Sequence, residues 1–268
     1  MKGLRSLSNL VGIDRMLRET ETFDSIVKAV YQITSEEIYG EALTSELAVY
    51  AYGSPGRREL VGGDSDADIL IVEKEKNATT KDFRKNFSRK LAKFGYSKID
   101  IPEWGTLDEI ETYLSKSLIE GNQLLETRLI EGDIQLDNKF SKLKKIYNSP
   151  EREIKNILFN RFYLNQYFKQ KISDGAPNIK YCHGGSREFL LILWYHNLMN
   201  MLERTNSESY LEPKVILGLN YLFSNNKLTE EQFNQTLEAI NFMTVLRGDV
   251  LNLNKSTDQK GLTFMDVK

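Results

Sequence analysis

The chain has 268 residues, and its 36 basic and 38 acidic side chains leave a net charge of −2, which gives no overall attraction for nucleic acid. Its length suits one large domain or two smaller ones, and its 40% apolar and 28% charged residues are ordinary for a globular protein. The lone cysteine, Cys182, excludes an internal disulfide. The sequence shows neither a signal peptide nor the ~18 consecutive apolar residues of a membrane span. We therefore expect a cytoplasmic protein with no membrane or nucleic-acid partner.

The first predicted elements are a helix and two strands. Apolar residues at helical spacing predict a helix within residues 1–48 that packs on a sheet. That spacing is carried by Ile26, Val27, Val30 and Ile33. Residues 47–72 predict a strand, a Gly-Ser turn and a second strand, and Gly62 and Gly63 mark the turn before the second strand.

Two acids head the second of these strands. Asp66 and Asp68 lie two positions apart, so their side chains point to one face and repel each other unless a cation lies between them. Mg²⁺ takes such carboxylates together with substrate phosphates. The bare backbone of Gly53 and Ser54 can approach a phosphate closely. An isolated Asp-x-Asp favours a solvated strand end, but its coupling to the upstream Gly-Ser turn favours a nucleotidyl-transfer site.

A third acid follows one helix later. Residues 79–93 predict a charged helix whose basic side chains form a solvated face. The alternation of Ile99, Asp100 and Ile101 then predicts a short strand with a single acid projecting opposite the isoleucines. A third carboxylate near the first two is what two-metal phosphoryl chemistry needs.

Helices dominate the remainder. A capping box at Thr106 opens a helix to about Lys116, and residues 122–131 predict another helix, in which Arg128 is a surface or salt-bridge arginine. Ser149 and Pro150 begin a helix to about residue 172. Its predicted buried stripe consists of Ile154, Leu158, Leu164 and Phe168.

The last predicted helices cover residues 189–202, apolar nearly all round, and residues 230–247, opened by a capping box at Thr229. His196 is a packed histidine in this interpretation. Cys182 and His183 have no second ligand pair for zinc, and the glycines after them predict a tight turn rather than an anion site. Because strand signals stop, we place a domain boundary near residue 140.

The motifs resemble those of the bacterial enzymes that uridylylate the PII signal protein and, more distantly, of the glutamine-synthetase adenylyltransferases. Both belong to the polymerase-β-like nucleotidyltransferases. The resemblance spans roughly residues 45–264. It is carried by Gly53-Ser54-Pro55-Gly56-Arg57-Arg58-Glu59-Leu60, Asp64-Ser65-Asp66-Ala67-Asp68, Arg128-Leu129-Ile130-Glu131-Gly132-Asp133, Asn178-x-Lys180, Gly184-Gly185-x-Arg187-Glu188, and Leu246-Arg247 followed by Leu262-Thr263-Phe264. The chain departs from the pattern at Cys182-His183, where the family has Gly-Pro, and at Glu188, where it has aspartate.

The resemblance implies an α+β fold: a polymerase-β-like nucleotidyltransferase core with a mixed sheet in residues 1–140, followed by an all-helical domain in residues 141–268. It implies metal-dependent transfer of UMP or AMP from a nucleoside triphosphate to a hydroxyl, on a protein such as a PII-type signal protein, and hence a part in signal transduction.

The implied roles fall on seven residues. Gly53 and Ser54 would hold the β- and γ-phosphates. Asp66 and Asp68 would bind two Mg²⁺ ions, with Mn²⁺ as an alternative, and Asp100 would bind the ion nearer the nucleophile and accept its proton. The lower-ranked phosphate contacts are Arg57 and Lys180.

Two other functions stay open. The same core could modify a small molecule such as an antibiotic, or the chain could be a non-catalytic nucleotide-sensing module, although clustered repelling acids argue against the second. No His-Asp doublet of the family's nucleotide-removing hydrolase domain is present in this sequence. We therefore expect either a stand-alone transferase that does not remove the modification or a chain truncated from a longer enzyme.

Overall fold

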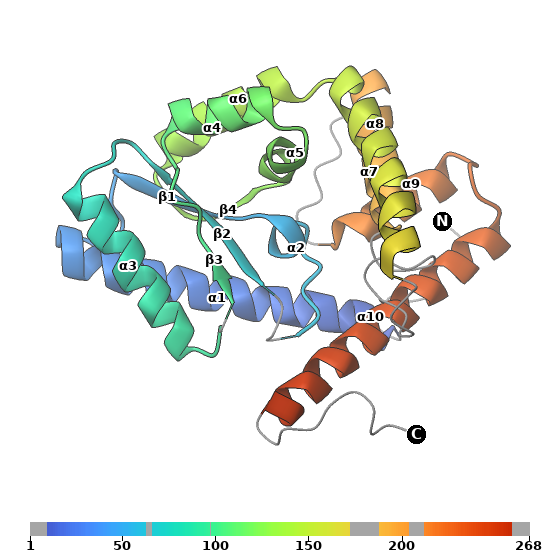
Figure 1. Cartoon of the computed structure of the whole chain (residues 1–268), viewed down its shortest axis with the longest axis horizontal. Helices are drawn as coiled ribbons and strands as arrows, with labels where there is room; N and C mark the ends of the chain where they lie inside the picture. Colours follow the sequence, from blue (N-terminus) through green and yellow to red (C-terminus); the bar gives the residue numbers. More distant parts are fainter. Residues whose placement is uncertain (1–9, 63–65, 97, 172–187, 204–211, 259–268) are drawn as a thin grey trace.

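The computed structural model describes residues 10–62, 66–96, 98–171, 188–203 and 212–258 (Figure 1). Its centre is a four-stranded sheet in the order β3-β2-β1-β4. The strands are β1 (Leu47–Ala51), β2 (Ala67–Glu73), β3 (Ile99–Asp100) and β4 (Arg128–Gly132). β1 runs antiparallel to β2 and β4, while β2 and β3 are parallel, so the predicted mixed sheet of an α+β fold is confirmed.

Both faces of the sheet are covered, which explains why all five residues of β1 are buried. Leu47, Val49 and Ala51 face a core built with α1 (Val11–Tyr39) and α3 (Ala78–Lys93). The alternate residues Ala48 and Tyr50 face a second core built with α4 (Leu107–Lys116), α5 (Ile119–Leu125) and α6 (Ile134–Tyr147). Figure 1 shows these two helical layers on opposite sides of the sheet.

The predicted helices that cover the first face are present, with two differences. Val27 and Val30 of α1 are fully buried as expected, but Ile33 is 46% exposed. Arg84 of α3 was expected on a solvated basic face, yet it donates hydrogen bonds to the carbonyl oxygens of Ile71 and Pro102 and pairs with Glu73 at 3.0 Å. The guanidinium therefore joins α3 to the neighbouring strand.

The predicted helix over residues 122–131 is wrong in its second half. α5 ends at Leu125, and Arg128 to Gly132 form β4 along the outer edge of β1. The backbone groups of β1 on that side need partners, and β4 supplies them, so a long-range pairing overrides the local helical pattern. Arg128 makes the expected salt bridge, with two hydrogen bonds of 2.7 and 2.8 Å to Asp24 of α1.

The predicted domain boundary falls inside α6. Phe140 in that helix is fully buried and packs edge-on against Tyr50 of the sheet, with ring centroids 5.0 Å apart. The division into residues 1–140 and 141–268 stays a prediction.

The second half of the chain is helical, as expected. It contains α7 (Pro150–Lys171), α8 (Leu190–Glu203), α9 (Lys214–Ser224) and α10 (Glu230–Asp258). The start of α1 packs into a core with α9 and α10, in which Ile13 is fully buried beside Ile216. None of the described helices is both long enough and apolar enough to cross a membrane.

α8 and α10 confirm their predictions. Leu193 and Trp194 of α8 are buried, and His196 packs against Tyr221 while its Nε2 lies 2.9 Å from the Asn200 amide. Thr229 caps α10 as expected, and the helix extends past residue 247 to Asp258.

α7 begins at Pro150 as predicted, but its buried stripe is wrong. Ile154 and Leu158 are 45% and 61% exposed, whereas Glu153 and Asn156 are 4% and 2% exposed. The side chains of Leu164 and Phe168 lie outside the described set. The inward face of α7 is polar because it borders the cleft described next.

Candidate active site

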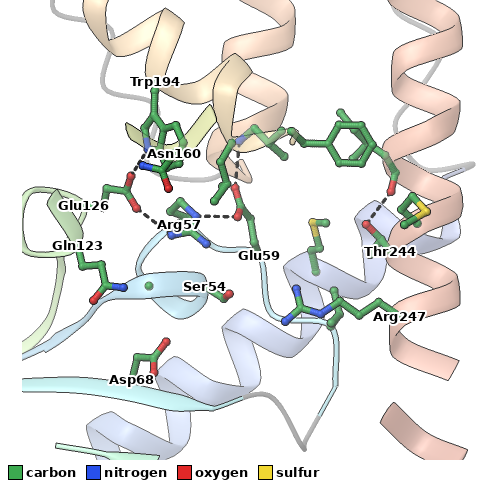
Figure 2. A pocket seen from close by; sticks show the side chains of 18 of the residues that line it. Ser54, Arg57, Glu59, Asp68, Gln123, Glu126, Asn160, Trp194, Thr244 and Arg247 are labelled. Carbon is green, nitrogen blue, oxygen red and sulfur yellow. Dashed lines mark hydrogen bonds and ion pairs between the residues drawn. The ribbon is translucent and has the colours of Figure 1, made fainter. Parts of the chain in front are cut away.

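A cleft of about 230 Å³ lies between the sheet and the helical half (Figure 2). One wall comes from β2 and from the short turn of helix α2 (Gly53–Gly56), and the other comes from α5, α7, α8 and α10. The polar residues that line it are Ser54, Arg57, Glu59, Asp66, Asp68, Asn122, Gln123, Glu126, Asn156, Asn160, Thr244 and Arg247. Met16, Phe189, Leu190, Trp194 and Met243 are among its apolar lining residues.

The predicted Gly-Ser turn lies directly against the predicted acid pair. Gly53 has a φ of +58°, in the left-handed region that favours glycine. A Cβ placed on Gly53 would lie 2.3 Å from Oδ2 of Asp68. The Tyr52 N–H also donates to the Asp68 carbonyl oxygen at 3.1 Å. The absence of a side chain at Gly53 is therefore what allows the Asp68 carboxylate to rest on this turn.

The three predicted acids lie on neighbouring strands. Asp68 of β2 is the register partner of Asp100 of β3, and Asp66 lies one residue before β2. Register partners on adjacent strands point to the same face, as do residues two apart on one strand. Asp66 and Asp100 are exposed, Asp68 is half-buried, and Asp66 and Asp68 line the cleft. The sheet thus presents three carboxylates on one face, and two of them, Asp66 and Asp68, line the cleft.

These carboxylates do not form a ready-made metal centre. Within the part of the chain that the structure describes, no three His, Cys, Asp or Glu side chains gather closely enough to hold a metal ion. Their oxygen chemistry nevertheless suits Mg²⁺, which is commonly held by one or two carboxylates with substrate phosphates completing its shell. The binding of two Mg²⁺ ions by Asp66, Asp68 and Asp100 stays a prediction.

Tyr52 is a site residue that the sequence reasoning missed. Its hydroxyl donates a hydrogen bond of 2.6 Å to Oδ2 of Asp100. Burial raises the pKa of Tyr52 far above its usual value, and the hydrogen bond to Asp100 and the charges of Asp68 and Asp66 raise it further. The phenol therefore stays protonated and holds the Asp100 carboxylate in place. Its position one residue before Gly53 was the available signal.

Arg57 faces the cleft, but its charge is compensated within the protein. Nε donates to Glu59 and Nη1 donates to Glu126, each at 2.8 Å. Burial alone would lower the pKa of Arg57, and the two carboxylates raise it overall. A role for Arg57 as a phosphate contact is untested, and the ion pairs give it a structural role.

Glu126 connects this arginine to the helical half, which no sequence signal indicated. Its Oε1 accepts a hydrogen bond of 2.8 Å from Nε1 of Trp194 in α8, while its Oε2 accepts from Arg57 (Figure 2). Lys214 of α9 adds two bonds, from its backbone N–H to the Arg57 carbonyl at 3.0 Å and from Nζ to the Glu126 carbonyl at 3.3 Å. This network joins α2, α5, α8 and α9 in the wall of the cleft.

Two further basic residues, Lys180 and Arg247, are relevant to phosphate binding. Lys180 lies outside the described residues, so the structure does not place it. Arg247, which the sequence reasoning did not select for the site, extends from α10 into the cleft on the side that faces Ser54 (Figure 2).

The helix α7 also contributes a buried carboxyl group. Glu153 is buried beside Glu126, and burial together with that neighbouring charge raises the pKa of Glu153 to about 8. At neutral pH this carboxyl is therefore largely protonated.

Comparison with known proteins agrees with the site geometry. Residues 9–100 match the family model described as "Putative nucleotidyltransferase DUF294", whereas no curated protein matches the chain. The matched region runs from the start of α1 to Asp100 and so includes the Gly53 turn and all three acids. The match does not single out PII uridylyltransferases. Residues 9–100 are similar to nucleotidyltransferases, and this similarity supports nucleotidyl transfer in general, with a nucleotide as substrate.

Proposed function

We propose that this chain transfers a nucleoside monophosphate, UMP or AMP, from a nucleoside triphosphate to an acceptor hydroxyl in the cytoplasm, with release of pyrophosphate. The observation that carries the proposal is the packing of the Asp68 carboxylate on the bare Gly53 turn, with Asp100 beside it in register. The Gly53 turn, whose bare backbone can approach a phosphate, therefore lies in the same cleft as the acids of β2.

The two walls of the cleft contribute different contacts to the triphosphate. The backbone of Gly53 and Ser54 contacts the triphosphate on one wall, and Arg247 approaches it from the other. Bound Mg²⁺, with Mn²⁺ as an alternative, would be held by Asp66 and Asp68 and would neutralise the charge on the reacting phosphate and the leaving pyrophosphate. Lys180 and Arg57 remain proposed phosphate contacts.

Asp100 acts on the acceptor side. It is exposed and does not line the cleft, so an acceptor hydroxyl reaches it from outside while the triphosphate lies within. Asp100 takes the proton of that hydroxyl, and Tyr52 orients its carboxylate.

An acceptor that approaches from outside suits a hydroxyl on a protein, such as a PII-type signal protein, which is the acceptor that the sequence resemblance favours. Transfer to a small molecule on the same core is the rival function.

The test incubates the purified chain with α-labelled UTP or ATP, Mg²⁺, and either a PII-type protein or small-molecule acceptors, and identifies modified species by mass spectrometry. Asp66→Asn combined with Asp68→Asn should abolish transfer, while Asp82→Asn on the exposed face of α3 should not. Both variants should keep a cooperative thermal transition. A doubly substituted chain that still transfers nucleotide at a comparable rate would rule out this site, and nucleotide binding without transfer to any acceptor would favour a sensing module.

A further inference from the structure

The end of the cleft opposite Asp68, which we call its inner end, contains hydrogen-bond donors without partners. Nδ2 of Asn122 and Nδ2 of Asn156 are buried and make no hydrogen bond, and Oε1 of Glu153 is also without one. The three side chains are only 6%, 2% and 4% exposed. A buried polar group without a partner is costly, so such a cluster points to a ligand or an ordered water that completes it.

Each asparagine is held in place through its oxygen, which leaves its nitrogen directed elsewhere. Oδ1 of Asn122 accepts a hydrogen bond of 2.8 Å from Nε of Arg152, and Oδ1 of Asn156 accepts one of 2.6 Å from Nδ2 of Asn160. These bonds fix which end of each amide is the nitrogen. Both asparagines line the cleft, and the nitrogen of each is buried in the cleft wall without a partner.

This end of the cleft is unsuited to phosphates. The carboxylate of Glu126 lies there beside Glu153, and the apolar side chains of Leu190 and Trp194 line the same region. Figure 2 shows Asn160 and Trp194 at the end of the cleft opposite Asp68. A flat ring with polar edges fits apolar walls and a few fixed donors.

Resting on the proposed function, we propose that Asn122 and Asn156 form the base subsite of the nucleotide and donate hydrogen bonds to the carbonyl oxygens of a pyrimidine such as uracil. Uracil presents two carbonyl oxygens on either side of a ring N–H, one for each of the two amide donors. The corresponding edge of adenine presents a single ring nitrogen beside an amino group, which would leave one donor unpartnered. The subsite therefore selects UTP over ATP.

The variants that test the proposal remove only the amide donors. Asn156→Asp keeps the oxygen that Asn160 needs, and Asn122→Asp keeps the oxygen that Arg152 needs. Asn225→Asp makes the same change on the exposed end of α9 and serves as the control. Calorimetry measures the binding of Mg²⁺-UTP, Mg²⁺-ATP and Mg²⁺-tripolyphosphate to each variant that unfolds cooperatively.

The unmodified chain should bind UTP more tightly than ATP. Either cleft variant should lose about tenfold or more in UTP affinity, as expected for an unpaired buried group, with tripolyphosphate affinity unchanged. Equal binding of UTP and ATP, unaffected by either variant, would overturn the base subsite and leave nucleotidyl transfer standing. A chain that binds no nucleotide at all would overturn both proposals.

Discussion

The contact between Gly53 and Asp68 predicts a specific outcome for Gly53→Ala. Alanine at a φ of +58° costs about 1–2 kcal/mol of backbone strain. In addition, the new Cβ would meet Oδ2 of Asp68 at 2.3 Å, more than 1 Å inside an ordinary contact, so the carboxylate must move. Because a misplacement of about 1 Å in a catalytic group can cost 10²-fold, nucleotide transfer should fall by about that factor.

Gly40→Ala provides the matched control. Gly40 ends α1 with a φ of +77°, and a Cβ there would have no neighbour within 4 Å. This variant carries the backbone strain without the clash, so it should lose about 1–2 kcal/mol of unfolding free energy and keep its activity. Urea denaturation and the transfer assay measure the two effects.

A double-substitution cycle completes this test. In an Asp68→Ala background the clash is gone, and Gly53→Ala should cost only as much as Gly40→Ala. Equal stability and equal activity for Gly53→Ala and Gly40→Ala in the otherwise unchanged chain would refute the close approach of Asp68 to the turn.

Two further predictions concern buried charged groups in and near the wall of the cleft. Glu126→Gln leaves Arg57 with one carboxylate and should lower the unfolding free energy by about 3 kcal/mol. The control Glu131→Gln breaks the half-exposed pair with Lys28 and should lower it by less than about 1 kcal/mol. Equal losses in urea denaturation would contradict the network. Glu153 has a folded pKa raised to about 8, so its contribution to stability is present below its unfolded pKa and is lost as the pH rises toward 8. We expect a fall of about 2 kcal/mol between about pH 6 and pH 7.5 that Glu153→Gln removes, and parallel pH profiles for the two proteins would contradict the burial of this carboxyl.

The sequence predicts those elements whose signals are local. The capping box at Thr106 opens α4 at Leu107, and Pro150 begins α7, because the caps satisfy the first free N–H groups of each helix. β4 was assigned to a helix because its strand state depends on β1, about 80 residues earlier in the chain. Only the pairing of Tyr50 with Leu129 and its neighbours decides that segment.

The orientation of α7 fails for a different reason. The apolar pattern assumes that polar side chains face solvent, and this is not true beside a polar cleft. Asn156 is buried and lines that cleft, and Glu153 is buried on the same helix, while Ile154 and Leu158 turn outward. A misassigned stripe of this kind is expected at functional sites, where local rules are broken for the sake of the site.

The candidate site also contains some residues that the sequence could bring together and others that it could not. Gly53, Asp66 and Asp68 lie within one short motif, so the sequence places them together, and the register of β2 with β3 brings in Asp100. Trp194 and Glu126 are 68 positions apart, and their hydrogen bond depends on how the helices dock. Patterns of residue spacing carry no information about such a contact.

The buried network accounts for the position of the turn relative to the opposite wall. Removing Arg57 and Glu126 from water is costly, and an apolar pair of the same shape would often be at least as stable. An apolar pair would not fix direction, however, whereas the bonds from Arg57 and Trp194 to the two oxygens of Glu126 require one orientation of α2 relative to α8. Because Gly53 lies on α2, that orientation also sets where the Gly53 turn and Asp68 lie relative to α7, α8 and α10. A transferase that relies on positioning gains from walls held in this way before the nucleotide arrives.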